Sequence, residues 1–373
     1  MDFIPVNEPV FNGNEAKYLL ECIRSGWISS EGPFVQKFEE KFANEIGCKY
    51  GIAVTNGTAA LDVAIEALGI SKGDEVIIPS FTIISCVLQV IRSGAKPVFV
   101  DSCDKTWNMD VDKIEEKINK NTKAILAVHT YGLPVNLNPV ISLCERYNLK
   151  LIEDTAEQIG QNYYKKKCGS LSDISTFSFY PNKHITTGEG GMILTNNSEI
   201  AERCRELRNL CFEKDKRFFH NSLGWNLRMT NLQAAIGVAQ LEQLNTFIKK
   251  KRWIGRQYNS LLKNIEGINL PLEKVQYADN IYWVYGIVLD ESYGSASEVI
   301  KSMAKEGIGC RPFFFPMHQQ PVVNKFGYGV NEKYPVAERI SEQGFYIPSG
   351  LGISLEQIEK VVFKLKKVLG IEQ

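Results

Sequence analysis

The sequence predicts an α/β fold with a mostly parallel sheet, followed by a smaller α/β region at the C-terminal end. Short apolar segments without the alternation of a half-buried strand are separated by segments with helical spacing of apolar residues. Strands of this kind are typical of a parallel sheet that helices cover on both faces. After about residue 240 a lysine-rich helix leads into mixed strand and helix segments. A chain of 373 residues commonly forms two domains, so we expect a large domain over residues 1–240 and a small C-terminal domain over 241–373.

The expected elements follow from the spacing of apolar residues and from the turn residues between them. Before residue 240, the expected helices are 14–25, 33–46, 59–67, 84–92 and 139–147. The expected strands in the same part are 50–54, 75–78, 97–100, 124–128, 149–152, 174–180 and 192–195. After residue 240 we expect helices at 241–262, 296–306 and 354–369 and strands at 282–289 and 310–315, and the helix from Leu232 onward can belong to both domains. Ligands bind such sheets at the carboxyl ends of the parallel strands.

Charge and cysteine content exclude several classes of protein. Lysine and arginine together number 43, as do aspartate and glutamate, so no basic excess suits the chain to nucleic acid. The N-terminus lacks the pattern of a signal peptide, and no apolar stretch is long enough to span a membrane. The nine cysteines are scattered and include no C-x-x-C pair. We therefore expect a cytoplasmic protein with reduced thiols, no metal site, and no nucleic-acid or membrane partner.

Lys183 is the first candidate for chemistry. It lies in a loop after the predicted strand 174–180, and a glycine-rich segment with few charges follows it. Burial in such a pocket lowers the pKa of a lysine amine and suits it to Schiff-base formation. A surface lysine in a glycine loop is the alternative.

Asp154 and Glu157 form the second candidate, at the end of the predicted strand 149–152. An acidic residue at the end of a buried strand requires a partner. The ring nitrogen of pyridoxal phosphate is one such partner, because an ionised carboxylate keeps it protonated and lets the ring accept electrons. The alternative is a helix N-cap at Asp154 with Glu157 in the first turn.

The third candidate is the segment from Asn56 through Gly57 and Thr58, at a strand-to-helix turn. Backbone N–H groups at a helix N-terminus, together with a small hydroxyl side chain, can bind a phosphate. An ordinary turn and cap would have the same sequence. Taken with Lys183 and Asp154, however, the segment completes the three attachment points that pyridoxal phosphate needs, each at the end of a different strand.

These motifs resemble those of the DegT/DnrJ/EryC1/StrS aminotransferases, which act on nucleotide-linked keto sugars. The resemblance spans nearly the whole chain. The segments that carry it are 56–61, 153–157 and 178–191, together with 26–32, 79–82, 94–101, 129–132, 226–237 and 311–318. It implies a fold-type I aminotransferase, with a large mixed but mostly parallel sheet domain and a smaller C-terminal domain.

The resemblance also implies roles for individual residues. Lys183 matches the lysine that binds pyridoxal 5′-phosphate covalently and then moves the proton, and Asp154 matches the partner of the ring nitrogen. Glu157 matches the position beside the ring hydroxyl, and Phe81 the aromatic position that stacks on the ring. The phosphate positions are matched by Gly57, Thr58, Ser178 and, reaching the other subunit's site, Asn226. A shared site of this kind implies a homodimer.

The resemblance further suggests the substrate. Similarity to the perosamine-type branch favours GDP-4-keto-6-deoxymannose as amino acceptor and L-glutamate as donor, with a UDP- or dTDP-linked keto sugar as the alternative. A cofactor-binding regulator without turnover is an alternative from another class. The residues placed near the substrate are Trp27, Ser29, Ser30, His184, Arg311 and His318, and for each of them plain packing is the other interpretation.

Two further histidines have simpler interpretations. His129 ends a predicted strand and is expected to be buried and hydrogen-bonded. His184 follows Lys183 and is interpreted as a loop packing residue, with a base role toward the sugar as the alternative. A related branch, the sugar 3-dehydratases, has histidine where this chain has Lys183, so lysine at this position favours amination.

Overall fold

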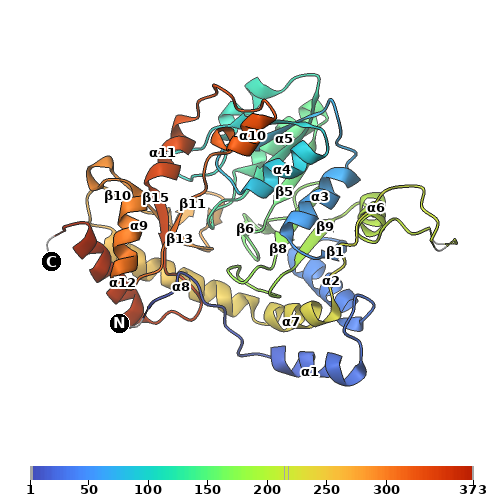
Figure 1. The fold of residues 1–373 in the computed structure, drawn as a ribbon, viewed down its shortest axis with the longest axis horizontal. Coiled ribbons are helices and arrows are strands. Elements are labelled where there is room, and N and C mark those ends of the chain that lie inside the picture. Colours follow the sequence, from blue (N-terminus) through green and yellow to red (C-terminus); the bar gives the residue numbers. More distant parts are fainter. Residues whose placement is uncertain (1–2, 214, 217, 372–373) are drawn as a thin grey trace.

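A seven-stranded sheet forms the centre of the larger part of the molecule (Figure 1). The structure is a computed structural model and describes residues 3–213, 215–216 and 218–371. The strands lie in the order β1-β9-β8-β5-β4-β2-β3. Their bounds are β1 Tyr50–Val54, β2 Glu75–Pro79, β3 Lys96–Val100, β4 Thr122–Val128, β5 Lys150–Asp154, β8 Ile174–Ser178 and β9 Gly191–Thr195. All neighbouring pairs are parallel except those of β9, which runs antiparallel to β1 and β8, so the prediction of a mostly parallel sheet is confirmed.

Helices cover both faces of this sheet. Val76 and Ile78 pack in the core that also contains buried residues of α3 (Gly57–Ala67), α4 (Ile84–Arg92) and α6 (Ser198–Arg208). Ile77, whose side chain points to the other face, packs in a core with residues of α5 (Leu137–Tyr147). A third core lies beneath β8 and β9, with α2 (Pro33–Ile46) and α7 (Asn231–Leu241). Burial on both faces explains why these strands are apolar throughout.

The sheet order brings the carboxyl ends of β1, β5 and β8 to the same edge. Asp154, the last residue of β5, is level with Thr176 in β8. Ser178 ends β8 opposite Gly191, and Val54 at the end of β1 is also opposite Gly191. The loops that follow these three strands therefore converge.

A second sheet lies in the C-terminal part of the chain. It has the antiparallel order β10-β13-β15-β14, with bounds β10 Ile268–Asn269, β13 Tyr285–Leu289, β14 Arg311–Pro312 and β15 Gly344–Ile347. Its core includes residues of α8 (Leu244–Leu262), α9 (Ala296–Lys305) and α12 (Leu355–Val368). The remaining helices and strands are short or peripheral: α1 Glu15–Ser25, α10 Pro321–Lys325, α11 Pro335–Gln343, β6 Asn162–Tyr163, β7 Lys166–Lys167, β11 Lys274–Val275 and β12 Ala278–Asp279.

Some predicted boundaries were wrong. The expected helix 241–262 begins at Leu244, after a break that separates it from α7. Of the expected strand 310–315, two residues form β14, and the next residue, Phe313, packs in the core of the first sheet. Figure 1 shows α7 beneath the first sheet and α8 beneath the second. The N-terminal end of the chain also contacts the C-terminal part, because Ile4 forms a β-bridge with Ile308. The division at residues 240 and 241 stays a prediction. Within the described residues, no helix combines the length and apolar character needed to cross a bilayer.

Candidate active site

Lys183 lies in the loop that follows β8, and its amine faces a cavity. The amine nitrogen is 3.8 Å from the centroid of the Trp283 ring. The carbonyl oxygens of the two preceding residues accept hydrogen bonds, Asn182 from the Trp283 indole at 2.8 Å and Pro181 from the Asn7 side chain at 3.1 Å. Burial lowers the pKa of the Lys183 amine, although the nearby carboxylates oppose this effect. A lysine with these properties is a better base and nucleophile near neutral pH than an exposed one.

Asp154 and Glu157 face the same cavity. One Asp154 oxygen accepts the Ala156 N–H at 3.0 Å, and the other accepts the buried thiol of Cys86 at 3.2 Å. Glu157 accepts the N–H of Tyr131 at 2.8 Å. Burial raises the pKa of Glu157 to about 8, against the attraction of Lys183. The site therefore contains the Asp154 carboxylate, held by two donors, and the Glu157 carboxyl group, which stays protonated to a higher pH than an exposed glutamate.

The N-terminus of α3 forms the third part of the site. The Asn56 side chain caps the helix by accepting the N–H of Ala59 at 2.8 Å. The N–H groups of Gly57 and Thr58, the first two helical residues, point out of the helix end and are available to a ligand. The hydroxyl groups of Thr58 and Ser85 lie 3.0 Å apart. A Cβ atom at Gly57 would lie 2.8 Å from Cβ of Ser178. Glycine thus keeps open a small polar concavity of the kind that a phosphate fills.

These three groups line a single cavity of about 710 Å³. Six of the residues predicted to bind the cofactor line it: Gly57, Thr58, Asp154, Glu157, Ser178 and Lys183. The cavity is large enough for a cofactor and part of a substrate, since small-molecule sites measure about 300–1,000 Å³. An amine, a fixed carboxylate and a helix N-terminus at one cavity are the donor and acceptor set that pyridoxal phosphate requires.

Comparison with known proteins agrees with this geometry. The profile of the DegT/DnrJ/EryC1/StrS aminotransferase family matches residues 10–366. The chain belongs to this family. A GDP-perosamine synthase of Escherichia coli O157:H7 is 42% identical over 358 residues, which cover 96% of each chain. A GDP-perosamine synthase of Vibrio cholerae is 40% identical over 360 residues, covering 96% of this chain and 97% of the relative.

A solved structure agrees as well. The crystal structure of the aminotransferase TlmJ from Streptoalloteichus hindustanus matches with a TM-score of 0.92 and 28% identity, covering 98% of this chain and 99% of that chain. The fold is that of a fold-type I aminotransferase. This DegT/DnrJ/EryC1/StrS aminotransferase depends on pyridoxal 5′-phosphate, and the residues around its cavity fit that cofactor.

Phe81 does not lie on the cavity. Its side chain is fully buried, and its ring centroid is 5.8 Å from that of Tyr131 and 5.9 Å from those of Phe313 and Phe314. Phe81 comes one residue after Ser80, which follows β2, and it packs in the core, whereas Ile83, at the N-cap of α4, lines the cavity. The stacking position expected at Phe81 is therefore corrected, because Ile83 is the apolar residue that this segment presents to the cavity.

Two histidines predicted near the substrate are buried away from the cavity. His184 is 1% exposed and its Nε2 lies 3.3 Å from the carbonyl oxygen of Ile281. Burial lowers the pKa of His184 to about 3, so it stays neutral. His318 is held at both ring nitrogens, by Ser80 at 2.6 Å and by Glu338 at 3.0 Å. Both substrate assignments are corrected, because these side chains pack and form hydrogen bonds within the fold. For His184 this agrees with its interpretation as a loop packing residue, and for His318 it agrees with the alternative of plain packing.

Arg311 lies beside the cavity without lining it. It is exposed at the start of β14, and its register partner in β15 is Tyr346, which lines the cavity. In the described chain its guanidinium donates to the carbonyl oxygen of Cys310 at 3.0 Å. An exposed cation next to the opening can still meet a diphosphate, and that role stays a prediction.

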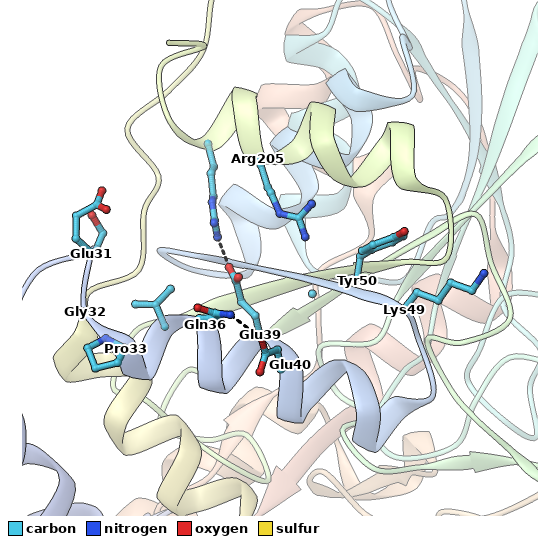
Figure 2. Close-up of a pocket in the computed structure, with 13 residues that line it drawn as sticks. Glu31, Gly32, Pro33, Gln36, Glu39, Glu40, Lys49, Tyr50 and Arg205 are labelled. Carbon is cyan, nitrogen blue, oxygen red and sulfur yellow. Dashed lines mark hydrogen bonds and ion pairs between the residues drawn. The ribbon is translucent and has the colours of Figure 1, made fainter. Parts of the chain in front are cut away.

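Asn226, Trp27 and Ser29 are exposed and do not line the Lys183 cavity of their own chain. Ser30 lines a different cavity, of about 470 Å³, between α2, β1 and α6 (Figure 2). There Glu39 forms an ion pair with Arg208. The reach of Asn226 into the other subunit's phosphate site stays a prediction, as does the place of Trp27, Ser29 and Ser30 beside the substrate.

The expectation for His129 is confirmed. It is fully buried, its Nδ1 accepts the N–H of Val135 at 3.1 Å, and its Nε2 lies 3.1 Å from a Glu153 oxygen. The nine cysteines are free thiols. Among the described residues, no group of histidine, cysteine and acidic side chains could hold a metal ion.

Sequence analysis missed part of the cavity wall. The missed residues include Asp62, Ile83, Ser85, Trp283, Phe314 and Tyr346. The first three lie within the predicted loop and helix segments, at positions next to the named motifs. The last three come from the C-terminal part. Phe314 lies within the recognised segment 311–318, whereas no local pattern marks Trp283 or Tyr346.

Proposed function

We propose that the chain transfers the amino group of L-glutamate to the 4-keto carbon of GDP-4-keto-6-deoxymannose and so makes GDP-perosamine. The observation that carries this proposal is the meeting of the Lys183 amine with Asp154, Glu157 and the α3 N-terminus at one cavity. The choice of sugar and nucleotide is supported by whole-chain similarity to the two GDP-perosamine synthases.

Each group at the cavity has a part in holding the cofactor. When bound, pyridoxal phosphate supplies an aldehyde for amines and a ring that accepts electron density. We assign its phosphate to the N–H groups of Gly57 and Thr58 and to the Ser178 hydroxyl. Asp154 is the carboxylate for the ring nitrogen, because two donors already fix its orientation. Glu157, with its raised pKa, can donate to or accept from the ring hydroxyl.

Lys183 is the base of the reaction. Once an amino donor has taken its place, its free amine removes the proton from Cα of glutamate. In the second half of the reaction it delivers a proton to C4 of the sugar. Burial aids the first step, because an amine with a lowered pKa is unprotonated in a larger fraction of molecules at neutral pH.

The proposal also includes a quaternary structure, a homodimer. We propose a homodimer in which Asn226 reaches the phosphate region of the partner's site, because this side chain is exposed and lies outside its own cavity. The exposed Trp27, Ser29 and Arg311 would then border the sugar nucleotide. A cytoplasmic location stays a prediction of the sequence.

Conversion of the cofactor can be followed in the visible spectrum. Glutamate should bleach the visible band of the holoenzyme. After glutamate is removed, GDP-, UDP- and dTDP-linked 4-keto sugars are added separately, and we expect the GDP sugar to restore the band fastest. Restoration by a UDP or dTDP sugar alone would refute the GDP assignment and favour that alternative. A bound cofactor whose band glutamate does not bleach would favour the regulator without turnover.

A further inference from the structure

Trp283 is the residue outside the recognised motifs that contacts Lys183 most directly. It lies just before β13, about a hundred residues after Lys183 in the chain, and is 4% exposed. It lines the Lys183 cavity. Its side chain makes two separate contacts with the Lys183 loop, one through the indole N–H and one through the ring face.

The first contact fixes the backbone of the loop. The indole donates to the Asn182 carbonyl at 2.8 Å, while the Asn7 side chain donates to the Pro181 carbonyl at 3.1 Å. On the other side of Lys183, His184 lies 3.3 Å from the Ile281 carbonyl oxygen. The loop is thus held on both sides of Lys183, and Trp283 supplies the bond next to it.

The second contact bears on the charge of the amine. A cation is attracted to an aromatic face, and tryptophan is the strongest partner of this kind. The Lys183 amine is 3.8 Å from the ring centroid, within the range of that attraction. The ring is stacked in turn on Tyr131, with centroids 5.8 Å apart and an interplanar angle of 27°. The backbone N–H of the same Tyr131 donates to Glu157.

The other groups that act on the amine are known. Asp154 ends β5, Glu157 follows it, and Cys86 lies in α4; these three favour the charged form, whereas burial disfavours it. The Trp283 face acts in the same direction as the carboxylates. Because it is uncharged, its effect does not change when a carboxylate is engaged by the cofactor.

We propose that Trp283 is a positioning residue for Lys183: its indole N–H fixes the loop backbone, and its ring face attracts the protonated amine and so raises the amine's basicity. This inference rests on Lys183 being the lysine that binds the cofactor. Between the two halves of the reaction, the free amine lies against the ring and stays within reach of the reacting carbon.

Loading of the cofactor tests the proposal without measuring turnover. Cofactor-free protein is mixed with pyridoxal phosphate, and the growth rate of the visible band is measured from pH 6 to 10 for wild type, Trp283→Leu and Trp283→Phe. The acid limb of this profile reports the ionisation of the amine. For Trp283→Leu we expect the midpoint to fall by about 0.4 to 1.5 pH units, because a lost cation–π contact shifts the pKa by that amount.

Trp283→Phe separates the two contacts. It keeps an aromatic face, so the midpoint should move less than half as far as in the leucine variant. It lacks the N–H donor, so the plateau rate at high pH should fall by about 2- to 13-fold, as expected for one hydrogen bond. An unchanged plateau in this variant would refute the positioning role, and this variant is informative even if Trp283→Leu fails to fold.

Two controls complete the test. Trp107→Phe alters a buried tryptophan that packs on Phe313 and is not among the residues that line the Lys183 cavity, and it should leave midpoint and plateau unchanged. Lys183→Ala should remove the band. If the band survives in Lys183→Ala, the proposed function fails; if the band is lost there but Trp283→Leu keeps the wild-type midpoint, the Trp283 proposal alone is refuted.

Discussion

Gly57 offers the sharpest test of the phosphate position, because its replacement by alanine has a defined steric result. The new Cβ would lie 2.8 Å from Cβ and 3.3 Å from Oγ of Ser178. Carbon atoms in contact are normally about 3.5–4.0 Å apart, so α3 and the end of β8 must separate by at least about 0.7 Å. That movement displaces both the N–H groups of the helix N-terminus and the Ser178 hydroxyl from a bound phosphate.

The expected loss can be estimated from one hydrogen bond. A bond to a charged group contributes about 1.5–3 kcal/mol, so Gly57→Ala should weaken cofactor binding by about 10- to 150-fold. Overpacking should also lower the free energy of unfolding of the cofactor-free protein by about 1–3 kcal/mol. Binding is measured by titrating cofactor-free protein with pyridoxal phosphate and following the visible band.

The matched variants separate the clash from a general effect of an added methyl group. Gly352→Ala places a Cβ no closer than 3.9 Å to its neighbours and should bind like wild type. Ser178→Gly removes the Cβ atom with which the new methyl group would clash. The double variant Gly57→Ala/Ser178→Gly should therefore lose less cofactor affinity than the sum of the losses in the two single variants. Binding by Gly57→Ala within threefold of wild type, or strictly additive losses in the double variant, would refute the assignment.

Three further predictions concern stability and the corrected residues. Phe81→Ala should lower the free energy of unfolding in urea by about 3–5 kcal/mol, whereas Ile83→Ala should change it by less than about 1 kcal/mol and weaken cofactor binding instead; the reverse pattern would restore Phe81 to the cavity. Burial lowers the pKa of Lys251 to about 7, so above that pH this side chain binds more protons in the unfolded chain than in the folded one. Its contribution to the free energy of unfolding should therefore rise between pH 7 and 10, by up to about 1.4 kcal/mol per pH unit. Lys251→Met should flatten the rise in urea unfolding at pH 7, 8 and 9, and an equal slope would contradict this. His318→Asn should cost about 1–3 kcal/mol of stability with the sugar KM within twofold of wild type, and a tenfold higher KM at normal stability would return His318 to the substrate site.

The parts of the site next to parallel strands could be predicted from the sequence. Asp154 ends an apolar strand, and Gly57 and Lys183 lie shortly after one. The rule that carboxyl ends of parallel strands meet at one edge predicts that the three lie together. The helix cap at Asn56 could also be predicted, because asparagine is a preferred N-cap residue. Local sequence carries this information because each residue lies at the end of an apolar strand or a few residues after one.

The remaining wall depends on contacts between distant segments. Trp283 and Tyr346 reach the cavity because the second sheet packs against the first. The spacing of apolar residues along the sequence does not predict how two sheets pack together. Phe81 and Ile83 differ by two positions at a strand-to-helix turn, where strand alternation no longer decides which side chain faces inward. His318 was misplaced because its partners, Ser80 and Glu338, are remote from it in the sequence.

The lysine that holds the cofactor can be identified directly. Holoenzyme is reduced with sodium borohydride, digested, and analysed by mass spectrometry, so that the covalent label is mapped to one residue. We predict that the label is on Lys183, at the cavity with Asp154 and the α3 N-terminus. A label on another lysine, such as the buried Lys251, would contradict the active site described here.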